Sequence, residues 1–308
     1  MEDMGKNLTK ILKERNLSEQ YEKLMQEVLN DRDVQDFIKK NEEMLTKESI
    51  IKSYANLYEF VNEKKKYQEK VGMMAPGYKP QLVMNYHFIA VSYVPTAELI
   101  AKQKEQAIKA RIHSMDMPKD VRTATFEQFY NTDMRENAIN AAYDFIGDYL
   151  ENPKGFHQGL YLHGAFGVGK SFLLGAIAHE LAEKGYPTTL MHFPSFAVEM
   201  KQAISQNTTG EKLEAVKKSP ILMLDDIGAD SMSSWIRDDV LGVILQYRMQ
   251  EQLPTFFSSN LDMKHLGEEH LRVTQRGEDE PLKAQRIMER IKYLSKELQM
   301  TGKNRRLS

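Results

Sequence analysis

The spacing of apolar residues divides the chain into a helical first part and a second part in which strands alternate with helices. In residues 1–66, apolar positions recur at helical spacing, which predicts several short amphipathic helices. Residues 81–94 are rich in β-branched and aromatic side chains and predict a strand pair. Residues 97–114 predict a polar helix, which the segment 115–119 ends. This order predicts a small, mainly helical domain with one hairpin, connected by a helix to a second domain.

In the second part, the alternation of strands and helices is typical of a mostly parallel sheet covered by helices on both faces. A helix is predicted over residues 131–150, and short strands over residues 159–163, 188–193, 220–225 and 255–260. Residues 267–281 are polar and aperiodic and predict a mobile surface loop. The fold class is therefore expected to be α/β.

Size, charge and composition exclude several classes of protein. The 308 residues suffice for two domains with separate cores. The net charge of −2 and the isoelectric point of about 6.5 argue against a protein that coats nucleic acid by bulk charge, although a local basic patch stays possible. Without cysteine, there is neither a disulfide nor a thiolate metal site. No secretory leader and no apolar stretch of about 18 residues is present, so a cytoplasmic protein without membrane contact is expected.

A glycine-rich segment between the first strand and its helix matches the phosphate-binding pattern G-x-x-x-x-G-K-[ST]. Its glycines permit positive φ angles, which turn backbone N–H groups toward anionic oxygens at a helix N-terminus. Lys170 would reach the β- and γ-phosphates of ATP, and the hydroxyl of Ser171 would hold Mg²⁺. The residues expected to bind the nucleotide here are Gly164, Ala165, Phe166, Gly167, Val168, Gly169, Lys170, Ser171 and Phe172.

Polar residues end two of the other predicted strands. Asp225 and Asp226 close an apolar strand; Asp225 would bind Mg²⁺, directly or through water, and Asp226 would orient or deprotonate an attacking water. Asn260 closes a strand expected beside the first one. Its amide would point at the γ-phosphate, or it is an ordinary cap of a buried strand. Because ligands bind at the carboxyl ends of parallel strands, these residues predict one nucleotide crevice.

The chain becomes basic from residue 283 to its end. Arg286 and Arg290 lie about one turn apart on a predicted helix, where they would meet phosphate oxygens or form surface ion pairs. An aromatic segment at 193–196, followed by several lysines, would contact single-stranded DNA or pack in the core. The residues alone do not decide between phosphate contacts and surface ion pairs for the two arginines, or between DNA contact and core packing for the aromatic segment.

This ordered set of motifs resembles that of the AAA+ ATPases. The residues within the motifs are similar to those of the bacterial helicase loaders. The segments that carry the resemblance are 161–171, 222–228, 257–260, 286–290 and 301–306. It implies an AAA+ P-loop domain with a five-stranded parallel sheet over residues 118–308. It further implies a helicase-binding domain over residues 1–96 and a linker helix over residues 97–117.

The resemblance also implies a function: with ATP and Mg²⁺, the chain would bring a hexameric replicative helicase of the DnaB type to single-stranded DNA. A DnaA-type initiator or primosome proteins would assist, and the chain would form homo-oligomers. Arg290 would be an arginine finger that acts on a neighbouring subunit's nucleotide, and Arg306 would sense the bound nucleotide. Related loaders carry a cysteine-based zinc site, but no zinc is expected here. Two alternatives stay open: a nucleotide-gated helicase adaptor that needs no turnover, and a transposition helper ATPase.

Overall fold

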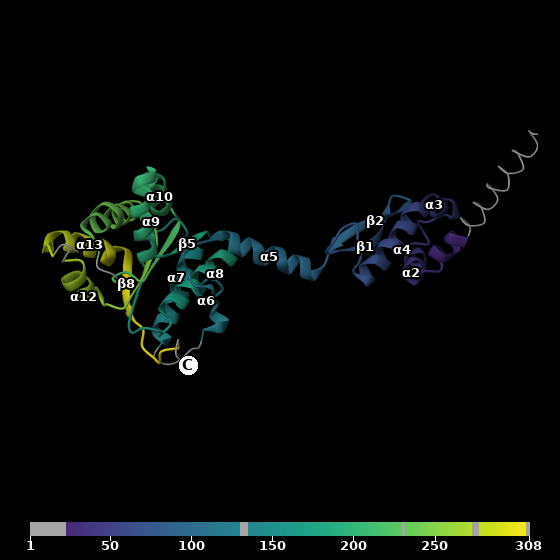
Figure 1. Ribbon diagram of the computed structural model, residues 1–308. Coiled ribbons are helices and arrows are strands. Elements are labelled where there is room, and N and C mark those ends of the chain that lie inside the picture. The colour runs from purple at the N-terminus through teal and green to yellow at the C-terminus, as the bar shows by residue number, and fades with distance from the viewer. Residues whose placement is uncertain (1–22, 130–134, 230–231, 273–276, 306–308) are drawn as a thin grey trace, which may run out of the picture. The chain divides into compact units, whose positions relative to one another are not determined.

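The computed structural model describes residues 23–129, 135–229, 232–272 and 277–305. Contacts within the chain divide it into two compact units, Met1–Lys104 (unit 1) and Glu105–Ser308 (unit 2). The division falls within helix α5 (Ala97–Arg111), in the segment 97–117 where a linker helix was expected (Figure 1). The amphipathic helix predicted before residue 23 lies outside the described residues.

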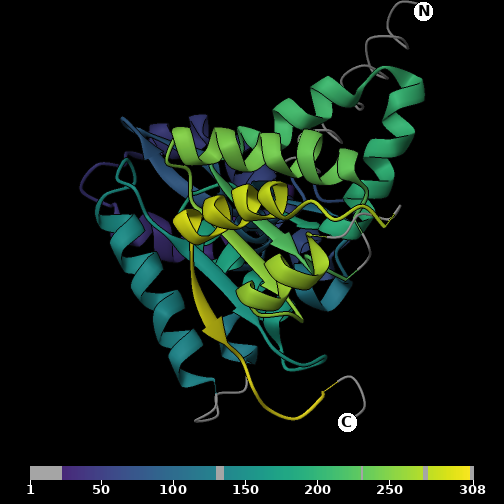
Figure 2. The same ribbon diagram turned by 90° about the vertical axis from the view of Figure 1, so that its left-hand side faces the viewer.

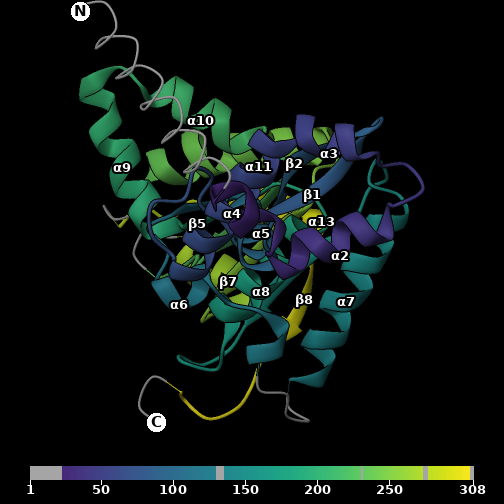
Figure 3. The same ribbon diagram turned by 90° about the vertical axis from the view of Figure 1, so that its right-hand side faces the viewer.

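Unit 1 gathers its helices beside a two-stranded antiparallel hairpin (Figure 1 and Figure 3). Its elements are α2 (Arg32–Lys40), α3 (Lys47–Lys52), α4 (Tyr54–Glu69), β1 (Tyr78–Asn85) and β2 (Phe88–Pro95). Side chains cap the helices: Asp31 accepts from the N–H of Asp33 at 2.9 Å, and Thr46 and Ser49 form a capping box. A small apolar core, which includes Leu57, Leu82 and Ile89, holds the hairpin against the helices.

Unit 2 contains a six-stranded parallel sheet in the order β3-β5-β6-β7-β4-β8. The strands are β3 (Ile112–Met115), β4 (Gly159–His163), β5 (Thr188–His192), β6 (Ile221–Asp225), β7 (Thr255–Ser259) and β8 (Ser295–Gln299). The helices are α6 (Lys119–Arg122), η1 (Phe126–Gln128), α7 (Glu136–Glu151), α8 (Lys170–Glu183), α9 (Phe193–Gln206), α10 (Thr209–Lys217), η2 (Ile236–Leu241), α11 (Gly242–Gln250), α12 (Met263–His265), η3 (Leu266–His270) and α13 (Pro281–Leu294).

Helices cover both faces of this sheet, and each face has its own apolar core. On one face α6, α7 and α8 pack against the strands. On the other face lie α9, α10, η2, α11 and α13, and Figure 2 shows α11 and α13 side by side there. Alternate strand residues supply the two cores; for example, Leu162 lies in one and Tyr161 in the other. The predicted α/β class is confirmed.

Three boundaries differ from the prediction. The sheet has six strands and not five, because the helix expected to reach residue 114 ends at Arg111 and the next four residues pair with the edge of β5. Residue 193 begins a helix instead of ending a strand. The predicted loop 267–281 begins within a π-helical turn, η3, and Arg272 forms an ion pair with Asp279. Among the described residues, no helix is both long and apolar enough to cross a membrane.

Candidate functional site

A cavity of 810 Å³ lies at the carboxyl ends of strands β4, β6 and β7 in unit 2. The sheet order places β7 between the other two strands, so the residues that follow all three strands meet at this edge. Lys170 and Ser171 line the cavity from the start of α8, and Asp225, Asp226 and Asn260 line it from the strand ends. The sequence prediction of one crevice formed by these motifs therefore matches the geometry.

The loop between β4 and α8 has the backbone that a phosphate-binding loop needs. Gly164, Gly167 and Gly169 have φ angles of 146°, 73° and 103°. A Cβ atom on Gly164 would lie 2.0 Å from the carbonyl oxygen of Met300, and one on Gly167 would lie 1.9 Å from Oδ1 of Asn304. Gly164 therefore requires glycine, because the clash is with backbone, whereas at Gly167 the positive φ angle favours glycine and the side chain of Asn304 could move. The loop ends at the N-terminus of α8, where the helix dipole favours an anion.

A chain of polar contacts connects the loop with the end of the sheet. Nζ of Lys170 donates to the carbonyl oxygens of Gly164 at 2.8 Å and Ala165 at 2.9 Å, and to Oδ1 of Asn260 at 2.8 Å. Nδ2 of Asn260 donates to Oδ1 of Asp226 at 3.2 Å. Asn260 thus connects Lys170 with the carboxylate of Asp226. A residue that only caps a strand would not make these two contacts.

Asp225 is a buried carboxyl group surrounded by hydroxyls. Ser258 Oγ donates to its Oδ1 atom, and the same Oγ accepts from the N–H of Asp226 at 2.9 Å. Burial raises the pKa of Asp225; hydrogen bonds from Ser258 and Ser171 oppose this rise, and the charge of Asp226 adds to it. A carboxylate beside a serine hydroxyl is the oxygen donor set that Mg²⁺ prefers, so Asp225 and Ser171 fit this ion.

The predicted loop residues take different positions. Phe166, Gly167, Gly169 and Phe172 line the cavity, whereas Val168 is fully buried in the core. Gly164 and Ala165 contribute the carbonyl groups that bind Lys170. Arg306 lies outside the described residues. Its neighbour Arg305 lines the cavity, and the backbone N–H of Arg305 donates to the carbonyl of Gly167 at 3.1 Å.

Several cavity residues were not predicted. Arg135 is 2% exposed, and its guanidinium lies 5.7 Å from the ring centroid of Phe129; burial and then the charge of Arg305 lower its pKa. His192 lies between Ser195 Oγ, at 2.9 Å from Nδ1, and Asp226 Oδ2, at 3.8 Å from Nε2. No local pattern marks Arg135. The position of His192 at a strand end was the one available signal.

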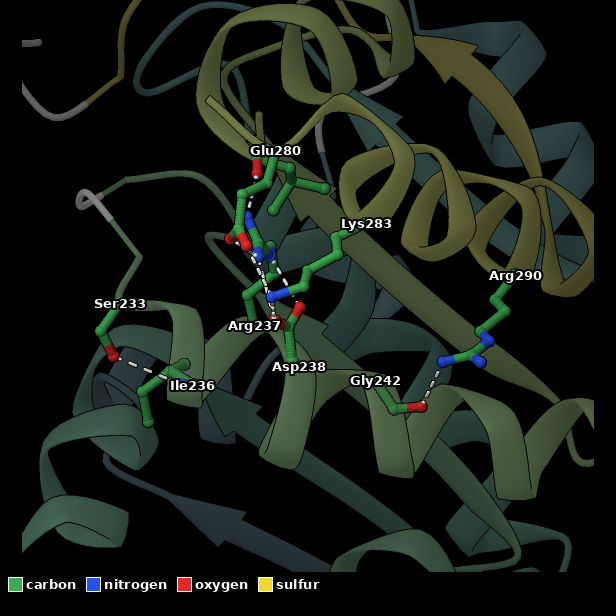
Figure 4. Close-up of polar contacts among 9 residues, drawn as sticks. Ser233, Ile236, Arg237, Asp238, Gly242, Glu280, Lys283 and Arg290 are labelled. Carbon is green, nitrogen blue, oxygen red and sulfur yellow. Dashed lines mark hydrogen bonds and ion pairs between the residues drawn. The ribbon is translucent and has the colours of Figure 1, made fainter. Parts of the chain in front are cut away.

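Arg290 lies in α13, away from this cavity. Its guanidinium donates to the carbonyl oxygen of Gly242 at 2.7 Å, as Figure 4 shows, and burial and then Arg286 lower its pKa. Figure 4 also shows the buried Arg237, which pairs with Asp238 and Glu280, and Lys283, which bridges the same two carboxylates. Arg290 therefore does not face the nucleotide cavity of its own subunit.

The aromatic segment at the start of α9 belongs to the core. Phe193 is 2% exposed and Phe196 is 1% exposed, so neither ring offers a stacking surface to a base. Three of the lysines that follow are paired with carboxylates: Lys212 with Glu199, and Lys217 and Lys218 with Glu214. Core packing is the correct choice for these aromatic residues.

Comparisons with known proteins identify the family. The family model for the N-terminus of primosomal protein DnaI matches residues 1–93, and the model for IstB-like ATP-binding proteins matches residues 86–308. The replicative helicase loader DnaI of Bacillus subtilis (strain 168) is 42% identical, over 99% of both chains. The chain belongs to the DnaI family.

Two solved structures with more than 40% sequence identity support the fold. A crystal structure of DnaI has a TM-score of 0.56 and 46% identity, and the match covers 64% of this chain and 98% of that chain. A primosome component from Streptococcus pyogenes serotype M3 has a TM-score of 0.54 and 44% identity, with 66% and 100% covered. Together with the two family models, these structures give a chain made of a DnaI N-terminal part, over residues 1–93, and an IstB-like ATP-binding part, over residues 86–308.

Proposed function

We propose that the protein is an ATP-dependent loader that delivers a hexameric, DnaB-type replicative helicase to single-stranded DNA at origins or restart sites during primosome assembly. The observation that carries the ATP-dependent part is the contact chain Lys170–Asn260–Asp226 at the end of the parallel sheet. The loader part is supported by the whole-chain similarity to a protein named as a replicative helicase loader.

In this proposal the chain's own residues hold the triphosphate and position a water molecule. The loop N–H groups and Lys170 bind the β- and γ-phosphates, and Asp226 accepts a proton from the water or orients it, with Asn260 beside it. Ser171 and Asp225 would hold Mg²⁺, which would supply positive charge to offset the charge of the phosphates. Arg290 of an adjacent subunit supplies the finger, and Arg306 senses the nucleotide.

The two units divide the work. Residues 1–96 bind the helicase, residues 97–117 connect the units, and residues 118–308 bind ATP and single-stranded DNA in a homo-oligomer. A DnaA-type initiator or primosome proteins direct the complex to its site in the cytoplasm. The model match for the DnaI N-terminus over residues 1–93 supports a separate role for the first unit.

Mass analysis of a mixture with the cognate helicase, with and without ATP, tests the loader. We expect a complex whose mass or stability changes with ATP, and we expect that Lys170→Ala removes only the ATP effect. Failure to associate in both states would leave an ATPase without this partner. If the mass and stability of the complex formed by the parent protein were the same with and without ATP, ATP dependence would be refuted.

A nucleotide-gated adaptor without turnover is the second candidate. It is favoured by one observation: Asp226 is a short carboxylate already engaged by Asn260 and flanked by His192, which suits slow hydrolysis. Loading by an Asp226→Asn protein would support the adaptor, whereas a helicase that stays trapped on this variant would support the full ATPase cycle. A pull-down of helicase by residues 1–115 tests the third candidate, a transposition helper ATPase. We expect a transposition helper to bind no helicase in this experiment.

A further inference from the structure

The two outer edges of the hairpin in unit 1 differ in the hydrogen-bond partners of their backbone groups. In the two-stranded sheet, Thr96 N–H donates to the carbonyl of Gly77 at 2.9 Å, and the register pairs Asn85 with Phe88. Odd-numbered residues of β1 therefore direct their backbone groups to β2. Even-numbered residues direct theirs outward, to the free edge of β1.

The outer edge of β2 is covered by side chains. Ile89 N–H donates to Ser53 Oγ at 2.8 Å, and its carbonyl accepts from Asn56 Nδ2 at 2.8 Å. The outer edge of β1 is not covered: in the described part of the chain, the outward backbone groups of Leu82 and Met84 meet no hydrogen-bonding partner.

Leu82 and Met84 line a groove of 820 Å³. Six successive residues, 79–84, contribute to its lining, together with residues of α2 and α4 and with residues 94–97 at the end of β2 and the start of α5. Phe37, Phe60 and Tyr67 give the groove an apolar surface. A groove with free strand hydrogen-bonding groups on one side and apolar side chains on the other fits an extended peptide that adds a strand.

The charges around the groove select the kind of peptide. Lys40 and Lys79 line it, and neither has an ion pair among the described residues. Asp33, the one acidic residue among the described residues that line the groove, is already paired with Lys64 at 2.8 Å. Pro80 supplies no N–H at its outward position, so pairing is centred on Leu82 and Met84.

We propose that the free edge of β1 binds an extended helicase segment with alternating apolar and acidic residues, which adds as a third strand between β1 and α2. This rests on the proposed function, which assigns the helicase to residues 1–96. Backbone hydrogen bonds at Leu82 and Met84 provide affinity, and Lys40 and Lys79 select acidic side chains.

Hydrogen exchange on the full-length protein, with and without the cognate helicase hexamer, tests the proposal without any substitution. We expect the amides of Leu82 and Met84 to exchange at least about tenfold more slowly in the complex, because each gains an acceptor. The amide of Ile89 is the internal control, because Ser53 already binds it. Protection of Leu82 and Met84 without helicase, lost on deletion of residues 1–22, would show that the chain's own terminus occupies the groove and would overturn the proposal.

Matched variants give a second measurement. Met84→Pro removes a backbone N–H that has no hydrogen-bond partner among the described residues. Met84→Ala shortens the side chain but keeps this N–H. We expect Met84→Pro to weaken helicase binding about tenfold more than Met84→Ala, with ATP binding unchanged. Lys40→Glu should weaken binding, and Lys39→Glu, outside the groove, should not. If all variants bound helicase equally well and both amides stayed unprotected in the complex, strand addition at β1 would be refuted, but helicase binding by the protein would not. If the parent protein did not bind helicase at all, the proposed function would be refuted as well.

Discussion

Nζ of Lys170 lies 2.8 Å from Oδ1 of Asn260, although 90 residues separate the two in sequence. This contact fixes the orientation of the Asn260 amide, because Oδ1 must accept from the lysine and Nδ2 then points at Asp226. The phosphate-binding lysine and the carboxylate expected to act on water are thus connected through one side chain.

Asn260→Ala should separate ATP binding from hydrolysis. The variant keeps the loop N–H groups and Lys170, so we expect ATP affinity to change by no more than a few-fold. Asp226 loses its oriented donor, and we expect the hydrolysis rate to fall about 100-fold. Fluorescent-nucleotide binding and phosphate release measure the two effects. A rate equal to that of the parent protein would remove Asn260 from the catalytic set.

Asp225→Asn should stabilise the protein when nucleotide and Mg²⁺ are absent. Burial raises the pKa of Asp225, so the folded state holds the proton more tightly than the unfolded chain, and stability falls as pH rises from the unfolded pKa through the folded pKa. The neutral amide avoids this loss. At neutral pH we expect a gain on the order of 1 kcal/mol in the free energy of unfolding, measured by urea titration in EDTA.

The control for this experiment is Asp239→Asn, which neutralises an exposed carboxylate of the same unit. Because this side chain is exposed, the substitution should leave the free energy of unfolding nearly unchanged. If Asp225→Asn were instead destabilising across the whole pH range, its charge would be compensated in the folded protein, contrary to the burial argument.

Much of the site could be predicted because its signals are local. A glycine-rich loop between a strand and a helix, and carboxylates at the end of an apolar strand, carry their geometry in adjacent residues. Arg135 and His192 carry no such pattern; they reach the cavity because α7 and β5 pack where they do. Strand β3 was missed for a related reason. Residues 112–115 continue a polar helix in sequence, and only the open edge of β5 makes them a strand.

Arg248 is fully buried, and its removal should be among the most destabilising changes in unit 2. Its guanidinium donates to the carbonyls of Ser219 and Pro254 at 2.6 and 2.7 Å, and to Thr255 Oγ1 at 2.8 Å. Arg248→Ala leaves these acceptors unpaired around a cavity, which we expect to cost about 3 kcal/mol or more. Arg248→Lys keeps the charge with fewer donors and should cost less. Thermal unfolding of both variants decides, and equal melting temperatures for Arg248→Ala and the parent would contradict the expectation.

Arg305 and Arg306 should differ in their effect on nucleotide affinity. The side chain of Arg305 lines the cavity, and its backbone is bonded to Gly167. We therefore expect Arg305→Ala to weaken ATP binding about tenfold, by loss of a cation near the phosphates. Calorimetry with ATP and ADP compares it with Arg306→Ala. A loss of affinity confined to Arg306→Ala would assign the sensor to that residue alone.

Arg290 should act only across a subunit boundary, because within its own chain its guanidinium is held by the carbonyl of Gly242. A mixing experiment isolates this role. Arg290→Ala keeps a complete nucleotide site but lacks the finger, whereas Lys170→Ala keeps the finger but binds nucleotide poorly. Each variant alone should hydrolyse ATP slowly, and an assembled mixture should recover activity, because Lys170→Ala subunits offer Arg290 to their neighbours. Arg286→Ala in place of Arg290→Ala is the matched control; recovery seen only with Arg286→Ala would transfer the finger to that residue.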